Sequence, residues 1–166
     1  MSKLNKRDRI KISENFYLDE FMHPDLYKMF GAKSTRYLNK QLVEIVELLR
    51  RGFNRERQMH NPSLPEIGFY LNNWANGGNL KNCGVRYFFK PHKKGSHSRH
   101  YWSFCADIHL TAGVDEKELY DHILRNKDYY FRKGLTTLED YDDTPGWVHI
   151  SIEWNPWDDE IRIIKP

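Results

Sequence analysis

Two segments of the sequence combine an apolar face with histidine or carboxylate side chains. A strand over 104–110 would place Cys105 and Asp107 together on one face, because side chains alternate along a β-strand. A strand over 147–154 would place His149 on a polar face in the same way. Neighbouring strands lie about 4.8 Å apart, so pairing of these two strands would bring imidazole and carboxylate groups into contact.

His100 lies seven residues before Asp107, and a bend between them would turn both side chains into one pocket with His149. Zinc accepts two imidazoles and a carboxylate, and a catalytic zinc site leaves a fourth position for water. Such a metal lowers the pKa of its water toward ~7 and polarises a carbonyl. The alternative is a solvated polar sheet face, since the sequence contains neither an HExxH nor a CxxC motif.

Several segments of the sequence match motifs of a known protein family. SRHYWSFCAD at 98–107 and WVHI at 147–150 resemble the SxHxxGxAxD motif and the later WVH strand of the M15 metallopeptidases. The sequence NNW at 72–74, the glycines after it and GVR at 84–86 resemble the NNW…GG…GxR run of phage members. Residues 13–21 resemble their N-terminal pattern, so the similarity covers nearly the whole chain. The family includes D-Ala-D-Ala carboxypeptidases and phage peptidoglycan endopeptidases, and shares its fold with the hedgehog signalling domain.

The resemblance implies a role for each matching residue. His100, Asp107 and His149 match the zinc ligands. Arg86 matches the arginine that holds the substrate or stabilises the oxyanion, a task suited to a fixed positive donor. Glu139 closes the segment LTTLED, as the family's acidic residue often closes the strand before WVH, and we expect it to act as the general base.

Two further positions are predicted to contact substrate. Ser98 matches the serine that precedes the first ligand, and Trp147 is expected to line the cleft, with Trp74 and Trp102 as other candidates. Aromatic rings there could stack on sugar or peptide, although most tryptophans simply pack. His92, His97 and His109 are expected to be solvated or to lie beside the site.

The sequence also departs from the family pattern. Ser103 replaces the motif's glycine, and the bend survives only if Ser103 needs no positive φ. Cys105 replaces the motif's alanine and is expected to be a small packing residue. Gly146 stands where many relatives carry an acid. The general base is therefore either Glu139 or one of the acids in the next loop, Asp140, Asp142 and Asp143.

Length and composition limit the class of protein. A chain of 166 residues with a net charge of +3 predicts one domain with a slight preference for anionic partners. There is no apolar run of roughly 20 residues that could span a bilayer, and no secretory signal is expected. The two cysteines form no disulfide framework. Nucleic acid is a weak candidate as the main partner, because the net charge is small.

The periodicity predicts an α+β domain with a mainly antiparallel sheet and flanking helices, similar to the hedgehog and DD-peptidase fold. We expect one domain over 1–166, with a flexible basic arm at 1–15 and a helical part at 16–60. The expected helices are at 16–30, from Ser34 or Thr35 to 52, and at 115–133, with a polar connector at 54–65. The expected strands are at 66–74, 83–90, 102–110, 135–140, 147–154 and 160–165.

These observations lead to one leading hypothesis and one alternative. The first is a Zn²⁺-dependent peptidase that hydrolyses amide bonds in peptidoglycan peptides, as a phage endolysin or a lytic enzyme carried in the virion. It would reside in the host cytoplasm before release, or in the virion with other virion components, and would act on the cell wall. The alternative is a non-catalytic virion structural or binding protein that retains the peptidase fold.

Overall fold

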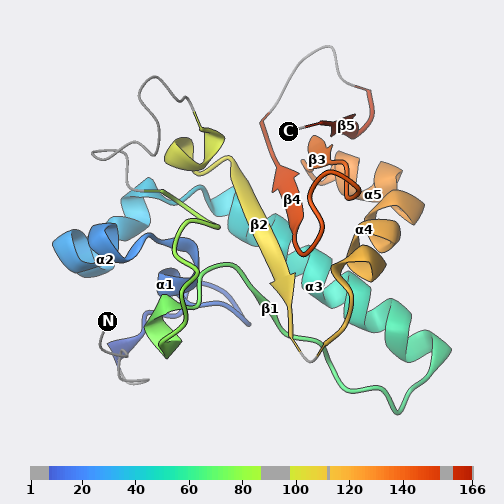
Figure 1. Ribbon diagram of the computed structural model, residues 1–166, viewed down its shortest axis with the longest axis horizontal. Coiled ribbons are helices and arrows are strands. Elements are labelled where there is room, and N and C mark those ends of the chain that lie inside the picture. The colour runs from blue at the N-terminus through green and yellow to red at the C-terminus, as the bar shows by residue number, and fades with distance from the viewer. Residues whose placement is uncertain (1–7, 87–97, 112, 154–158, 166) are drawn as a thin grey trace.

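The computed structural model describes residues 8–86, 98–111, 113–153 and 159–165 (Figure 1). The chain forms helices first and then alternates between strands and helices. The α-helices are α1 (Leu18–Phe21), α2 (Pro24–Phe30), α3 (Lys40–His60), α4 (Glu116–Arg125) and α5 (Lys127–Arg132). The 3₁₀ helices are η2 (Gly31–Tyr37), η3 (Trp74–Asn76) and η4 (Arg99–Trp102). The strands are β1 (Phe69–Tyr70), β2 (Cys105–Leu110), β3 (Thr137–Glu139), β4 (Val148–Ser151) and β5 (Arg162–Ile164).

The strands form one mixed sheet in the order β1-β2-β4-β3-β5. β2 pairs antiparallel with β1 and with β4, and β3 pairs antiparallel with β4. β5, however, pairs parallel with β3, with Leu138 opposite Ile163. The expected α+β class is therefore confirmed, and the sheet is mixed because its last strand joins β3 in the same direction.

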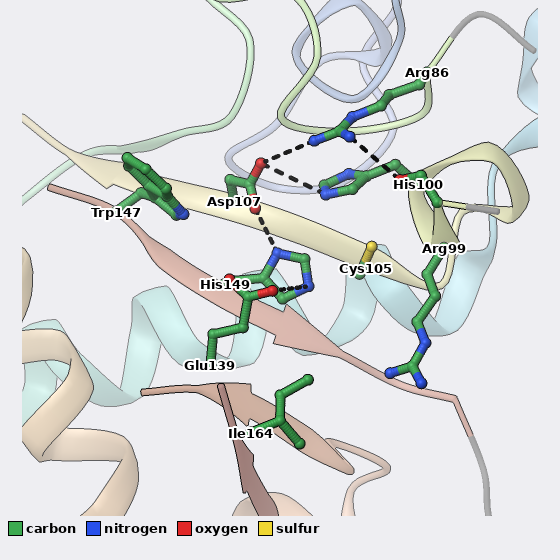
Figure 2. Close-up of a pocket in the computed structure, with 10 residues that line it drawn as sticks. Arg86, Arg99, His100, Cys105, Asp107, Glu139, Trp147, His149 and Ile164 are labelled. Carbon is green, nitrogen blue, oxygen red and sulfur yellow. Dashed lines mark hydrogen bonds and ion pairs between the residues drawn. The ribbon is translucent and has the colours of Figure 1, made fainter. Parts of the chain in front are cut away.

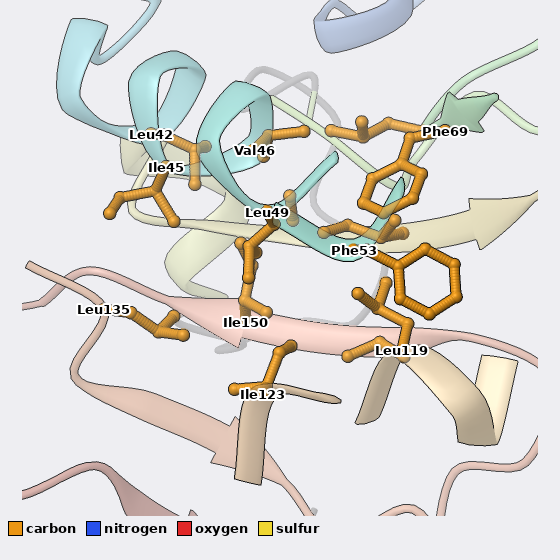
Figure 3. Close-up of a cluster of buried hydrophobic side chains, with 14 of the residues drawn as sticks. Leu42, Ile45, Val46, Leu49, Phe53, Phe69, Leu119, Ile123, Leu135 and Ile150 are labelled. Carbon is orange, nitrogen blue, oxygen red and sulfur yellow. The ribbon is translucent and has the colours of Figure 1, made fainter. Parts of the chain in front are cut away.

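The main core lies between α3, the sheet and α4. Leu42, Ile45, Val46 and Leu49 recur at helical spacing on α3 and are buried against the sheet, where Ile150 of β4 faces them (Figure 3). Burial of each such side chain stabilises the fold by about 1.5–3 kcal/mol. The apolar faces predicted for the strands at 104–110 and 147–154 belong to this core. Their polar faces therefore lie on the opposite side of the sheet.

α3 differs from its predicted bounds at both ends. Its N-cap is Asn39, whose side chain accepts a hydrogen bond from the Gln41 N–H, while Ser34 and Thr35 lie in η2. The helix also continues through Gly52 to His60, across much of the predicted polar connector. A Cβ atom at Gly52 would lie 2.4 Å from the Tyr130 hydroxyl, so glycine here lets α5 pack closely instead of ending the helix.

The other elements are mostly shorter than their predicted ranges. The helix predicted at 115–133 is divided into α4 and α5 at Asn126, and Gly134 follows at a φ of 103°. Of the strand predicted at 83–90, the part at 87–90 lies outside the described residues, and Val85 forms an isolated bridge with Met22.

The described part of the predicted N-terminal arm contacts the rest of the domain. Arg9 pairs with buried Asp19 at 2.7 Å, and Ser13 donates a hydrogen bond to Glu47 on α3. In the part of the chain that the structure describes, no helix is long and apolar enough to cross a bilayer.

Candidate functional site

A pocket of about 320 Å³ opens above the polar face of β2 and β4 (Figure 2). It collects side chains from η4, from the four strands β2, β3, β4 and β5, and from the loop that precedes β4. The three predicted ligands line it, as do Glu139, Arg86, Ser98 and Trp147, the first choices for base and substrate contacts. The full set is Arg86, Ser98, Arg99, His100, Cys105, Asp107, Glu139, Trp147, His149 and Ile164.

Strand register brings Asp107 and His149 together. The two residues are directly opposite in the antiparallel pair of β2 and β4, and Asp107 Oδ1 lies 2.5 Å from His149 Nδ1. Ala106 and Ile150, also opposite each other, face the core on the other side. The predicted alternation on both strands is therefore confirmed, and the sheet itself holds the two polar groups in place.

His100 reaches the same point from η4. Its Nδ1 lies 2.9 Å from the carbonyl oxygen of Gly84, so Nδ1 carries the proton and donates to that carbonyl. The other ring nitrogen, Nε2, lies 3.5 Å from Asp107 Oδ2. The His100 and His149 rings meet edge to face at 5.3 Å between centroids. A backbone carbonyl that orients an imidazole in this way is a common outer contact of metal-binding histidines.

The Asp107 carboxylate is the electrostatic centre of the pocket. Burial by itself would raise its pKa, but hydrogen bonds and positive charge from His100 and His149 hold that pKa well below the usual range. Arg86 Nη2 lies 3.7 Å from Asp107 Oδ2 and adds a further cation. Asp107 is therefore an anion, which is the state that a metal ligand requires.

Arg86 is held in place by its neighbours. Its Nε donates to the carbonyl oxygen of Asn82 at 2.9 Å, and its Nη1 donates to Ser98 Oγ at 3.2 Å. Its backbone N–H also donates to the carbonyl oxygen of His100. The guanidinium is thus fixed at the pocket wall, with Ser98 acting as its partner.

Glu139 places an acid beside the histidine pair. It ends β3, and its Oε1 lies 3.7 Å from His149 Nε2. The alternative acids Asp140, Asp142 and Asp143 do not line the pocket, and Asp143 lies 3.8 Å from Lys165. Geometry therefore favours Glu139 among the predicted bases.

Gly146 cannot readily be replaced by an acid. Its φ is 97°, a conformation that L side chains rarely adopt, although a Cβ atom there would meet nothing within 4 Å. The substitution is therefore limited by backbone strain and not by space.

Ser103 does adopt a positive φ, contrary to the condition set from the sequence. Its φ of 57° and ψ of 34° are left-handed, and among the described residues it is the only non-glycine with positive φ. The chain needs this conformation to end η4 and turn into β2. The Ser103 hydroxyl accepts a hydrogen bond from the Asn39 N–H at 2.9 Å, which ties the turn to the start of α3.

Cys105 lies closer to the histidines than the sequence suggested. Donor atoms of His100, Cys105 and His149, one from each, all lie within 4.8 Å of one another, and all three residues are buried. These three side chains could hold a metal ion. Burial raises the pKa of the Cys105 thiol, and the Asp107 charge adds to this effect. The position of Cys105 two residues before Asp107 was the only signal of this grouping in the sequence.

Other residues predicted near the cleft have different roles. Trp147 lines the pocket, but Trp74 is buried and donates from its ring nitrogen to the carbonyl oxygen of Met22. Trp102 is exposed and does not line the pocket. His109 lies beside the site, stacked on Tyr70. His92 and His97 lie outside the described residues.

Comparisons with protein-family models, with curated proteins and with solved structures gave no match to this chain.

Proposed function

We propose that this protein is a zinc-dependent peptidase that hydrolyses amide bonds in peptidoglycan peptides, with a fold related to the hedgehog and DD-peptidase group. The observation that carries the proposal is the convergence of His100, Asp107 and His149 at one end of a pocket that also contains Glu139 and Arg86. The motif resemblance in the sequence supports the choice of family and substrate.

The donor set fits a zinc ion. His100 directs its Nε2 toward Asp107, Asp107 is an anion, and His149 is in direct contact with Asp107. His100, Asp107 and His149 would hold the ion, since zinc prefers imidazole and carboxylate ligands in this number when it is catalytic. When bound, zinc supplies Lewis acidity for attack on an amide carbonyl.

The remaining residues act on the substrate and on protons. Glu139 takes a proton from the attacking water and then delivers it to the leaving amine, so one carboxylate serves as base and then as acid. Arg86 donates hydrogen bonds to the carbonyl oxygen as negative charge develops on it. Ser98 positions Arg86, and Trp147 lines the wall against which the peptide lies.

The proposal is tested with the full chain on purified peptidoglycan. We expect close to one zinc per chain by elemental analysis, and new amino termini in the digested wall by mass spectrometry. A chelator should stop cleavage and added zinc should restore it. Absence of cleavage by a folded, zinc-loaded protein would overturn the peptidase assignment.

A second candidate is a non-catalytic wall-binding or virion protein with the same site. Gly146 favours it, because its left-handed backbone leaves no acid at the position where many M15 relatives carry one. Binding of the zinc-loaded protein to peptidoglycan without release of peptides is the outcome that this candidate predicts.

A further inference from the structure

Cys105 faces the pocket and not the core. Its neighbour Ala106 lies in the hydrophobic core, whereas Cys105 is among the pocket-lining residues although it is only 1% exposed. In Figure 2 its sulfur projects from β2 on the side where His100 lies. A role in packing alone accounts for a small buried side chain, but it does not account for a thiol grouped with two imidazoles.

The two imidazoles beside this thiol are already oriented. His100 donates from Nδ1 to the Gly84 carbonyl, and His149 Nδ1 contacts Asp107. Donor atoms of both rings and the sulfur of Cys105 lie within 4.8 Å of one another. This separation allows the three donors to share one ion, because zinc binds sulfur at about 2.3 Å and nitrogen at about 2.0–2.1 Å.

We propose that Cys105 is a ligand of the metal ion, a role that rests on the metal site of the proposed function but not on its peptidase activity. Binding replaces the S–H bond with a metal–sulfur bond, and the proton leaves to the buffer without any electron transfer. A thiolate ligand favours zinc, cobalt(II) and other thiophilic ions over magnesium, manganese and calcium.

The thiolate adds a donor to the metal site. Cys105, His100 and His149 supply three donor atoms within 4.8 Å of one another, and a fourth position on a tetrahedral ion remains for Asp107 or water. Removal of the thiol should therefore weaken metal binding by at least about tenfold.

The test is cobalt(II) spectroscopy on the full chain. We expect a sulfur-to-cobalt charge-transfer band in the near ultraviolet for the unmodified protein. Cys105→Ala should lose that band but keep the weaker visible bands of bound cobalt. Cys83→Ala is the matched control, because Cys83 is also buried but lies against His109 and outside the metal group. Cys105→Ser keeps the side-chain volume and should likewise lose the band if the alanine variant does not fold.

Two results would overturn the proposal: cobalt bound to the unmodified protein without a sulfur band, or a sulfur band that survives in both Cys105 variants. Failure of folded protein to bind cobalt would remove the metal site altogether. Peptidoglycan cleavage is measured on the same zinc-loaded samples. Cleavage without a sulfur band contradicts the Cys105 proposal alone, and a sulfur band without cleavage contradicts the peptidase alone.

Discussion

Asp107 and His149 lie opposite each other on β2 and β4, with Asp107 Oδ1 2.5 Å from His149 Nδ1. The contact depends on strand register, because a shift of one residue would turn one of the two side chains into the core. Both residues are thus placed by the hydrophobic core on the far side of the sheet.

His149→Ala should abolish metal retention. The variant removes an imidazole that lies beside both His100 and Asp107, and we expect metal affinity to fall by about 100-fold or more. Elemental analysis after gel filtration measures the effect. His109→Ala is the control, because His109 stacks on Tyr70 outside the metal group and should retain full zinc content. Unchanged zinc in the His149 variant would remove that residue from the ligand set.

Glu139→Gln should preserve the metal but stop turnover. Glutamine keeps the shape of the side chain beside His149 but cannot accept a proton, so we expect cleavage to slow by about 10²–10⁴-fold. Asp143→Asn provides the comparison, since Asp143 pairs with Lys165 and does not line the pocket, so its loss should have little effect. A fully active Glu139 variant together with an inactive Asp143 variant would transfer the role of base to the following loop.

Arg86→Ala should impair catalysis more than folding. Loss of a fixed donor to a developing oxyanion lowers turnover by about 10²–10³-fold. Arg99→Ala is the control, because Arg99 also lines the pocket but is 41% exposed and pairs with Glu153. Thermal melts show whether stability changes. A large fall in melting temperature with little change in the turnover of folded protein would identify Arg86 as structural, through its bonds to Asn82 and Ser98.

How much of this site was predictable depends on the range of the interactions. Alternation of side chains identified the polar faces that carry Asp107 and His149, because that pattern is local to each strand. The grouping of Cys105 with His100 was not predictable, since it depends on the bend after η4 and on the Gly84 carbonyl, which contacts His100 from 16 residues away. For Ser103 the sequence allowed only a condition on its φ, because the value depends on where η4 ends and β2 begins.

The end of α3 also depended on a tertiary contact that the sequence pattern does not show. Its apolar spacing was readable from Leu42 to Leu49, but Gly52 looked like a stop signal. Contact with Tyr130 of α5, a tertiary interaction, makes glycine suitable inside the helix. The parallel pairing of β5 with β3 could not be predicted from the residue pattern of either strand. Strand direction in a sheet depends instead on how the connecting segments pack.

Ser103 allows a direct measurement of the strain in the turn that follows His100. Ser103→Gly removes a left-handed penalty of about 1–2 kcal/mol but loses a hydrogen bond from Asn39 worth about 1 kcal/mol. Its stability should therefore stay within about 1 kcal/mol of the unmodified protein. Ser103→Ala keeps the strain and loses the hydrogen bond, so it should be less stable than the glycine variant. Denaturant unfolding of both variants measures the difference, and equal stabilities would contradict the argument.

Glu20 should make stability depend on pH between about 5 and 8. Burial raises the pKa of this carboxyl to about 7 from an ordinary value of 4.5, although the Tyr17 N–H and Arg9 oppose the shift. Below pH 4.5 the carboxyl is protonated in both folded and unfolded chains. Between pH 4.5 and 7 the unfolded chain releases its proton while the folded chain keeps it, so stability falls, and the loss is complete once the folded carboxyl ionises above pH 7.

The expected loss from Glu20 across this range is on the order of 2–3 kcal/mol, since one pKa unit corresponds to about 1.4 kcal/mol. Denaturant unfolding at a series of pH values measures it. Glu20→Gln can still accept the Tyr17 hydrogen bond but has no charge, so its stability should change less over the same range. The comparison isolates Glu20 from all other titrating groups, and parallel pH profiles for the two proteins would show that this carboxyl does not ionise at elevated pH.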